Sequence, residues 1–415
     1  MKLSIFTPTH LPQHLVEAYD SIRRQNYQDW EWVLVPNGPK AFIPDQIRKD
    51  SRVKVVSGGE RLYNIGAIKR LACDNCSGDA FVELDHDDLL VPANSLTAVA
   101  NAFKKGAGFV FSDPAVFTYG GGAPPYGRFA YSPSHGWENY AVTVYGRKLL
   151  ASKAFEPSPR SLCEIYYAPD HVRCWSREAY YAAGGHNREL SVIDDHELMV
   201  KTYLAGFPFR HTGGCHYLYR YYPQNTVKGR GGQIKDLTRK FKVQYTKDLI
   251  YEWAHRENYE SLDLTKEVCA GGSNRVETVE KMLSHKSDLF RSNQYGVIQA
   301  ENLLQWLPGD LVADLVSACY RSLKPGGYLI ICVPDARTDV GFADPGYRSY
   351  YSKASMLPFV SKHYAADNGR VAARFQEVLT TDEFPSDWHK KMEFRYLRFH
   401  LCALKGQRQP GATSI

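Results

Sequence analysis

An apolar run that ends in three carboxylates within four positions most constrains what this chain can fold into. The run extends from Phe81 to Leu90, and the three clustered carboxylates are Asp85, Asp87 and Asp88. A short apolar run of this kind is typical of a buried parallel strand, whose carboxyl end lies where open α/β sheets hold ligands. Two carboxylates one residue apart suit a hard divalent cation that also holds a phosphate. The alternative is a solvated acidic turn, which is common at strand ends.

The residues before this run predict parallel strands joined by helices. Strands are predicted at 3–9, 30–35 and 52–56, and helices at 11–25 and 60–76. Strand, helix and strand at this spacing form βαβ units. Because the carboxyl ends of parallel strands share one edge of a sheet, we expect the end of the first strand, Asn37 and the Asp85 cluster to meet there.

Length and composition limit the possible classes of protein. A chain of 415 residues is too long for one core and predicts two domains. The net charge of +6 permits a nucleic-acid partner without requiring one, and the oligomeric state stays open. The nine scattered cysteines predict reduced thiols. The sequence shows neither a signal peptide nor an apolar run long enough to span a bilayer, so we expect a cytoplasmic protein.

Four segments in the first half carry a resemblance to a known family. They are Thr7-Pro8-Thr9, residues 21–31, Asn64-x-Gly66 and Leu84-Asp85-His86-Asp87-Asp88. Together they resemble family 2 glycosyltransferases of the GT-A fold. The resemblance implies a nucleotide-sugar donor whose diphosphate is held by Mn²⁺ or Mg²⁺ on Asp87 and Asp85, with Asp85 also contacting the ribose or the sugar.

The same resemblance implies further donor contacts. Thr7, Pro8 and Thr9 would line the nucleotide pocket together with Asn37 and Asn64. Lys69 or Arg70 would meet the diphosphate, although both also fit a solvated helix face. Where the family has an acidic pair after the second strand, this chain has Pro36-Asn37, so the nucleotide is not predicted.

A second acidic pair, Asp194-Asp195, begins a helical pattern that extends to Gly206. In the family, a pair at this place supplies the general base that takes the proton of the acceptor hydroxyl during inverting transfer. Asp195 matches the catalytic position, and Asp194 is its alternative. Both would also suit a helix cap. Downstream, the resemblance gives Arg220 the role of stabilising the leaving diphosphate.

The second half has a different character. A basic stretch predicts a helical linker, whose charged face leaves contact with nucleic acid or a membrane surface open. Beyond it, residues 319–329 resemble class I S-adenosylmethionine-dependent methyltransferases. However, Thr265-Lys266-Glu267 stands where that family has a glycine-rich turn, so we expect a degenerate domain with weak or absent cofactor binding. The predicted organisation is a GT-A domain at 1–226, a linker at 227–258, a second Rossmann-like domain at 259–405 and a flexible tail at 406–415.

These observations predict an α/β enzyme: an inverting, metal-dependent glycosyltransferase that transfers a sugar to a hydroxyl acceptor, with a glycan expected. One alternative is a bifunctional glycosyltransferase and methyltransferase. Another is transfer to a hydroxylated nucleic-acid base. A third is a non-catalytic nucleotide-sugar or glycan-binding protein, against which the two carboxylate clusters argue. Donor sugar, acceptor and linkage are not predicted.

Overall fold

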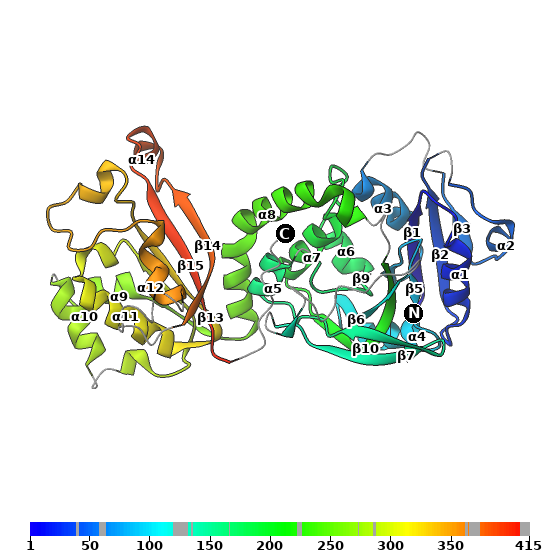
Figure 1. Cartoon of the computed structure of the whole chain (residues 1–415), viewed down its shortest axis with the longest axis horizontal. Helices are drawn as coiled ribbons and strands as arrows, with labels where there is room; N and C mark the ends of the chain where they lie inside the picture. The colour runs from blue at the N-terminus through cyan, green and yellow to red at the C-terminus, as the bar shows by residue number, and fades with distance from the viewer. Residues whose placement is uncertain are drawn as a thin grey trace. The chain divides into compact units, whose positions relative to one another are not determined.

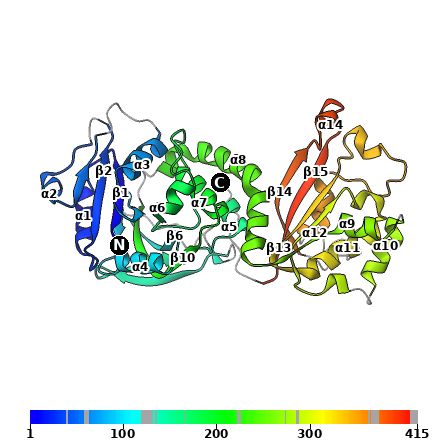
Figure 2. The same ribbon diagram turned by 180° about the vertical axis from the view of Figure 1, so that it is seen from behind.

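The structure is a computed structural model. It describes residues 1–38, 41–57, 64–118, 132–133, 136–165, 167–221, 226–272, 274–284, 288–361, 364 and 374–406. The chain forms two compact units, Met1–Tyr245 and Thr246–Arg408. Figures 1 and 2 show the elements of each unit from opposite sides. The predicted tail at 406–415 lies, apart from Gly406, outside the described residues.

The first unit is built on one large mixed sheet. Its strands are β1 (Leu3–Thr9), β2 (Trp30–Pro36), β3 (Val53–Val55), β4 (Ala80–Glu83), β5 (Leu89–Leu90), β6 (Phe109–Thr118), β7 (Asn139–Val144), β8 (Arg147–Ser152), β9 (Cys174–Ser176) and β10 (Phe209–Tyr221). Its helices are α1 (Leu15–Arg23), α2 (Asp45–Arg48), α3 (Ile65–Asp74), α4 (Ser95–Lys104), α5 (Pro159–Glu164), α6 (Arg177–Ala182) and α7 (Asp194–Leu204).

The strand order of this sheet is β3-β2-β1-β4-β9-β6-β10-β5, with the β7–β8 hairpin attached through β8 to β6. The strands β3, β2, β1 and β4 are parallel, so their carboxyl ends share one edge as the sequence predicted. The strand β9 is antiparallel to β4 and β6, which brings the residues just before β9 to that same edge. The functional candidates therefore converge on one edge of the sheet.

Side chains alternate along the strands and so create two buried faces. On one face, Leu3 and Ile5 pack with apolar residues of α1 and α4, such as Ile22 and Val99. On the other face, Phe6 packs with apolar residues of α3, α6 and α7. The sheet is thus covered on both sides, which explains why its strands read as nearly continuous apolar runs.

The run at 81–90 does not form a single strand. The strand β4 ends at Glu83, and Leu89–Leu90 form the separate strand β5, antiparallel to β10. The physical reason lies in Asp88, whose buried carboxylate accepts hydrogen bonds from Tyr217 and from the backbone of Arg220, so the chain turns toward β10. The acidic segment is therefore a fixed loop rather than a solvated turn.

The second unit has its own sheet, with the order β11-β12-β13-β15-β14. The first three strands are parallel, and β15 runs antiparallel to both of its neighbours. Its strands are β11 (Glu260–Asp263), β12 (Tyr295–Glu301), β13 (Leu323–Pro334), β14 (Phe375–Glu383) and β15 (Tyr396–Ala403). Its helices are α9 (Leu264–Ala270), α10 (Arg275–Leu283), α11 (Gly309–Ser322), α12 (Leu357–Val360) and α14 (Asp387–Lys391), with short 3₁₀ turns at Asp288–Phe290, Leu304–Trp306, Asp339–Phe342 and Lys353–Met356.

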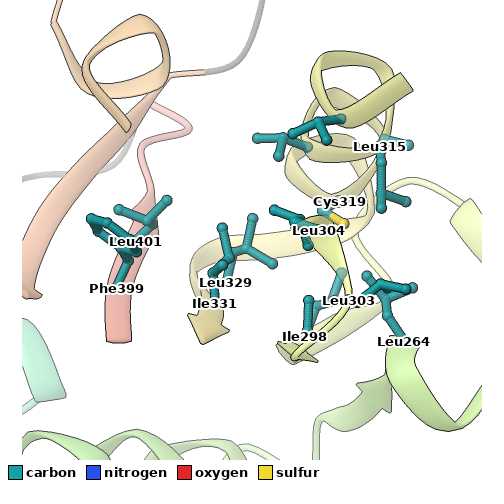
Figure 3. Packing of buried hydrophobic residues seen from close by; sticks show 14 of the residues in the cluster. Leu264, Ile298, Leu303, Leu304, Leu315, Cys319, Leu329, Ile331, Phe399 and Leu401 are labelled. Carbon is teal, nitrogen blue, oxygen red and sulfur yellow. The ribbon is translucent and has the colours of Figure 1, made fainter. Parts of the chain in front are cut away.

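An apolar layer joins the helices of this unit to one face of its sheet. In Figure 3, Leu315 and Cys319 of α11 point toward Ile298 of β12 and Leu329 of β13. The opposite face is covered by α8 (Thr226–Arg256), through Ile250 and Ala254. The boundary between the two units falls inside this helix. The second unit therefore has a complete α/β core, and the α/β class predicted for the chain is confirmed.

Two further findings concern both units. All nine cysteines are free thiols, and most of them are buried. Within the described residues, no helix is both long and apolar enough to cross a membrane.

A buried carboxylate in the first unit predicts how stability depends on pH. Burial alone would raise the pKa of Glu31, but hydrogen bonds from Ser4, Ser77 and Lys2 outweigh it and lower the pKa from 4.5 to about 2. Because the folded-state pKa is depressed, this stabilisation is complete above about pH 4.5 and is lost as the pH falls toward 2. Glu31→Gln should therefore flatten the loss of stability in this window. Urea unfolding from pH 7 to pH 3 measures it; equal slopes in both proteins would contradict the assignment.

Candidate active site

The end of β1 anchors the start of the segment that follows β4, at Leu84. The buried hydroxyl of Thr7 donates to the carbonyl of Leu84 at 2.6 Å and accepts the indole N–H of Trp32 at 2.9 Å. Thr7 is thus committed to protein partners. Its effect is to fix the backbone that leads into Asp85.

The other end of the segment is held by β10. The Tyr217 hydroxyl donates to Asp88 at 2.9 Å and accepts the backbone N–H of Asp85 at 3.2 Å. The guanidinium of Arg220 donates to the carbonyl of Asp87 at 2.6 Å and pairs with Glu17 at 2.9 Å. Arg220 therefore braces the loop that carries Asp85 and Asp87, a role that the sequence did not suggest.

The second acidic pair begins α7, as predicted. The residue before it, Ile193, adopts φ = +53°, a left-handed conformation that is strained for a β-branched side chain. Such strain persists only where surrounding contacts enforce it, and it clusters at functional sites. Here it sets the direction in which Asp194 and Asp195 leave the loop.

Helix α3 contacts the loop that leads to α7 without any intervening side chain. The N–H of Gly66 donates to the carbonyl of Leu190 at 3.0 Å, and a Cβ on Gly66 would lie 2.0 Å from the carbonyl oxygen of Asn187. The amide of Asn64 reaches the carbonyl of Arg188 at 3.2 Å. The Asn64-x-Gly66 motif thus docks α3 against this loop.

This close approach predicts that Gly66→Ala destabilises the first unit by about 1–3 kcal/mol, because backbone atoms have to move apart. Gly231→Ala is the control. Gly231 lies in α8, and a Cβ added there would meet no atom within 4 Å. The control should be neutral or up to about 1 kcal/mol stabilising. Chemical denaturation compares the two; equal stabilities would show that the loop yields freely.

Lys69 connects the two acidic clusters. Its buried ammonium lies 2.5 Å from Glu83 and 3.6 Å from Asp194. Burial lowers the pKa of Lys69, but Asp194 and Glu83 outweigh it and hold the pKa well above its usual value. Asp195 and Asp85 add to this effect. One buried cation therefore interacts with carboxylates from both clusters.

The two carboxylates of α7 differ in their surroundings. Asp194 Oδ2 lies 3.6 Å from the Lys69 ammonium and 2.9 Å from His186 Nδ1, and only 3% of the Asp194 side chain is exposed. The side chain of Asp195 is 20% exposed and pairs with the buried guanidinium of Arg173. Burial alone would raise the pKa of Asp195, but Arg173 above all keeps it well below its usual value. Asp195 is therefore ionised and open on one side.

Three residues of this network were missed by sequence reasoning: Glu83, Arg173 and His171. Glu83 is the last residue of β4, and Arg173 immediately precedes β9. His171 lies in the same segment, with Nε2 4.0 Å from Asp85. The only signal for them was a charged residue beside an apolar stretch, which was not sufficient.

The remaining predicted donor residues are spread around this edge. Thr9 is buried and bonds the carbonyl of Leu11, and the backbone of Asn37 bonds the carbonyl of Thr9. Pro8 precedes Thr9 in the buried end of β1. Arg70 lies next to Lys69 but pairs with Asp74 at 2.9 Å and with the carbonyl of Gly184. The structure thus does not bring Arg70 into the Lys69 network.

This edge of the sheet belongs to the part of the chain for which a family is indicated. Residues 4–156 match the family described as Glycosyl transferase family 2. The match supports a nucleotide-sugar glycosyltransferase of the GT-A type, as the resemblance in the first half implied. It includes Thr7, Asp85 and Asp87 but ends before Arg173 and Asp195. No curated protein matches the chain.

Several solved structures are similar to the chain at low identity. S. aureus TarS 1-349 has 15% identity and a TM-score of 0.41, covering 61% of this chain and 72% of its own. Its complex with UDP-GlcNAc has 16% identity and a TM-score of 0.41, covering 57% of this chain and 65% of its own. A Pyrobaculum calidifontis mannosyltransferase in complex with GDP-Man and Mn²⁺ has 14% identity and a TM-score of 0.38, covering 68% and 78%. At these values the similarities do not bear on function.

The described residues include no three carboxylate, imidazole or thiolate groups already arranged as ligands of one metal ion. Any protein-bound cation at Asp85 would therefore take part of its coordination from substrate or water, as Mg²⁺ usually does.

A hollow of about 480 Å³ lies elsewhere, between α4 and the start of β10, and is lined by residues that include Lys105 and Arg210.

Proposed function

We propose that the chain is an inverting, metal-dependent glycosyltransferase that moves a sugar from a nucleotide-sugar donor to a hydroxyl acceptor, with a glycan as the favoured class. The observation that carries this proposal is the Lys69 network. It links the Asp85 segment with the acidic start of α7, which supports a single site containing the two groups that the chemistry needs. The family match over residues 4–156 supports the same reaction.

Within this proposal, the N-terminal edge of the sheet holds the donor. Asp87 and Asp85 serve the divalent cation, which supplies positive charge against the diphosphate. Thr7, Pro8, Thr9, Asn37 and Asn64 shape the nucleotide side of the site. Thr7 acts through the backbone that it anchors, because its hydroxyl is already bonded on both sides. Residues 1–226 carry this chemistry.

Asp195 is the general base in this proposal, and exposure is the reason for choosing it over Asp194. The acceptor oxygen attacks the anomeric carbon while the bond to the diphosphate oxygen breaks, and the hydroxyl proton passes to Asp195. The 20% exposed carboxylate of Asp195 has lone pairs left beside those used by Arg173 and the His196 N–H. Asp194, at 3% exposure, is held inside the Lys69 network.

The cations around the site have different roles. Arg220 acts indirectly, because Glu17 and the carbonyl of Asp87 bind its guanidinium. Its loss would release the Asp87 loop. Lys69 counters the buried charge of Glu83 and Asp194, and Arg70 serves the Gly184 turn.

The second unit does not fit an S-adenosylmethionine site. The strand β11 ends at Asp263, which caps α9 through the N–H of Lys266, so no glycine-rich turn separates strand from helix. At the same edge, Glu301 and Asp335 are ion-paired, Glu301 with Arg398 and Asp335 with Arg337 and Arg395. We propose a supporting domain that lacks methyl transfer.

Donor binding tests the metal assignment. We expect Asp87→Ala to abolish or greatly weaken Mn²⁺-dependent binding of nucleoside diphosphates, since the substitution removes a ligand without touching the core. Calorimetric titration of UDP and GDP, each with Mn²⁺ and with chelator, measures it. Binding that is equal in the variant, or indifferent to chelator, would remove the cation from the proposal.

The reaction itself is tested by a screen of nucleotide sugars for hydrolysis, with and without Mn²⁺, followed by acceptors of two kinds. Transfer to oligosaccharides supports the proposal, and the anomeric configuration of the product tests inversion. Transfer to hydroxylated nucleic-acid bases instead would assign the other acceptor class. Donor binding without hydrolysis or transfer would identify a binding protein.

A further inference from the structure

His171 carries an unused nitrogen into the proposed donor site. The residue is 8% exposed and lies just before β9, and its ring stacks on Tyr217 at a centroid distance of 4.6 Å and an angle of 17°. Its Nε2 atom is buried and makes no hydrogen bond within the described residues. A buried polar atom normally has a partner, so this one calls for an explanation.

The other ring nitrogen is already engaged. His171 Nδ1 lies 3.2 Å from Asp170 Oδ1, which also accepts the backbone N–H of His171 at 2.7 Å. A carboxylate on Nδ1 favours the tautomer that is protonated there, leaving a lone pair on Nε2. Carboxylate, imidazole and metal form a recurring series in metalloproteins, in which the carboxylate orients the ring and raises its basicity.

The free nitrogen faces Asp85. Nε2 and Asp85 Oδ2 are 4.0 Å apart, which is too long for a hydrogen bond. Two bonds of about 2.0–2.3 Å to one ion span a separation of this size when they meet at a wide angle on the ion. Stacking on Tyr217 and the bond to Asp170 hold the ring in place, so this separation follows from the packing of the site.

We propose that His171 Nε2 binds the divalent cation of the donor site together with Asp85, with Asp170 positioning the imidazole. The proposal rests on the function proposed above and goes beyond it by adding a nitrogen ligand. Mn²⁺ prefers oxygen ligands, as Mg²⁺ does, but as a first-row transition-metal ion it accepts an imidazole nitrogen more readily than Mg²⁺. We therefore expect the site to favour Mn²⁺ over Mg²⁺, with Asp87, the donor diphosphate and water completing the coordination.

Electron paramagnetic resonance of Mn²⁺ tests this without any transfer reaction. The full-length protein is titrated with Mn²⁺ in the presence of UDP or GDP, and spin-echo measurements detect ¹⁴N bound to the ion. We expect a directly coordinated ¹⁴N in the wild type and its absence in His171→Phe, which keeps a ring against Tyr217. The same substitution should weaken Mn²⁺ binding at least about tenfold and Mg²⁺ binding much less.

The matched control is His211→Phe. His211 also lies in the first unit, but its Nε2 bonds Asp113 at 2.8 Å. It should leave the ¹⁴N signal and the affinity unchanged. If His171→Phe unfolds early in a thermal scan, Asp170→Asn serves instead. Its amide can donate to Nδ1 and place the ring proton on Nε2, which should cost about 10–100-fold in Mn²⁺ affinity.

The outcomes separate this proposal from the proposed function. Mn²⁺ bound through oxygen alone, or a ¹⁴N signal that survives in His171→Phe, would overturn the assignment while leaving glycosyl transfer possible. A His171-dependent ¹⁴N signal in a protein that transfers no sugar would support the ligand and remove the reaction. No Mn²⁺ binding with either nucleotide would overturn the proposal.

Discussion

Asp195→Asn should keep the fold and the affinity for the donor while lowering the rate of transfer by about 10² to 10⁴, the usual effect of losing a general base. Asparagine has nearly the same shape and still accepts the His196 N–H, but it cannot take a proton from the acceptor. Because Arg173 loses its charged partner, a lower Tm is also expected. Turnover is therefore compared well below both unfolding transitions, with donor affinity measured by calorimetry.

Asp194→Asn is the matched control, because it changes the neighbouring carboxylate by the same single atom. It should act mainly on stability, since Lys69 and His186 contact the side chain that it alters. A variant at Asp194 that loses transfer while Asp195→Asn keeps it would reverse the two roles. If both variants remain active, the pair serves only the start of α7.

Lys69→Met should cost about 3–5 kcal/mol of stability, because it leaves Glu83 and Asp194 as buried charges without their cation. One oxygen of Glu83 already makes no hydrogen bond within the described residues, so Glu83 depends on Lys69 to balance its charge. Chemical denaturation at pH 7 measures the loss. Donor binding should fall as well, since the Asp85 segment follows Glu83 directly.

Arg70→Met is the adjacent control on α3. Arg70 forms a partly exposed pair with Asp74, and such pairs contribute about 0–1 kcal/mol. The double variant Lys69→Met with Glu83→Gln should recover part of the stability, because it removes one of the stranded charges. If Lys69→Met were as stable as Arg70→Met, the prediction would be wrong, because Glu83 and Asp194 would then be hydrated well enough to need no cation.

The parts of the fold that follow from local pattern were readable in the sequence. The strand predicted at residues 3–9 has the bounds of β1, because its run of apolar, Ser and Thr residues ends where the helical pattern begins. The edge shared by Thr7, Asn37 and Asp85 followed from the parallel order of neighbouring strands. The apolar run at 81–90 predicted one strand longer than β4. The strand ends early because the buried Asp88 bonds Tyr217 of β10, which lies far along the chain.

Residues whose role depends on distant pairing were not readable. Arg173 reaches the site because β9 pairs antiparallel with β4, and no spacing in the sequence announces that pairing. For Arg220, the sequence offered a cation near the donor but could not show that Glu17 binds it. Residue type and position thus sufficed to propose the carboxylates as candidates, whereas the ion pairs that Lys69 and Arg173 form with them required the tertiary structure.

The position of α8 bears on how the protein could be divided into fragments. A fragment that begins at Tyr259, after the basic stretch, would lack Ile250 and Ala254 and would expose apolar residues such as Val297 to water. A fragment that stops at Thr226 would lose the buried side chains Phe241 and Tyr245 from the other side of the boundary. Each truncation thus disrupts apolar packing that α8 provides. Expression of separate halves therefore requires each half to retain its own turns of this one helix.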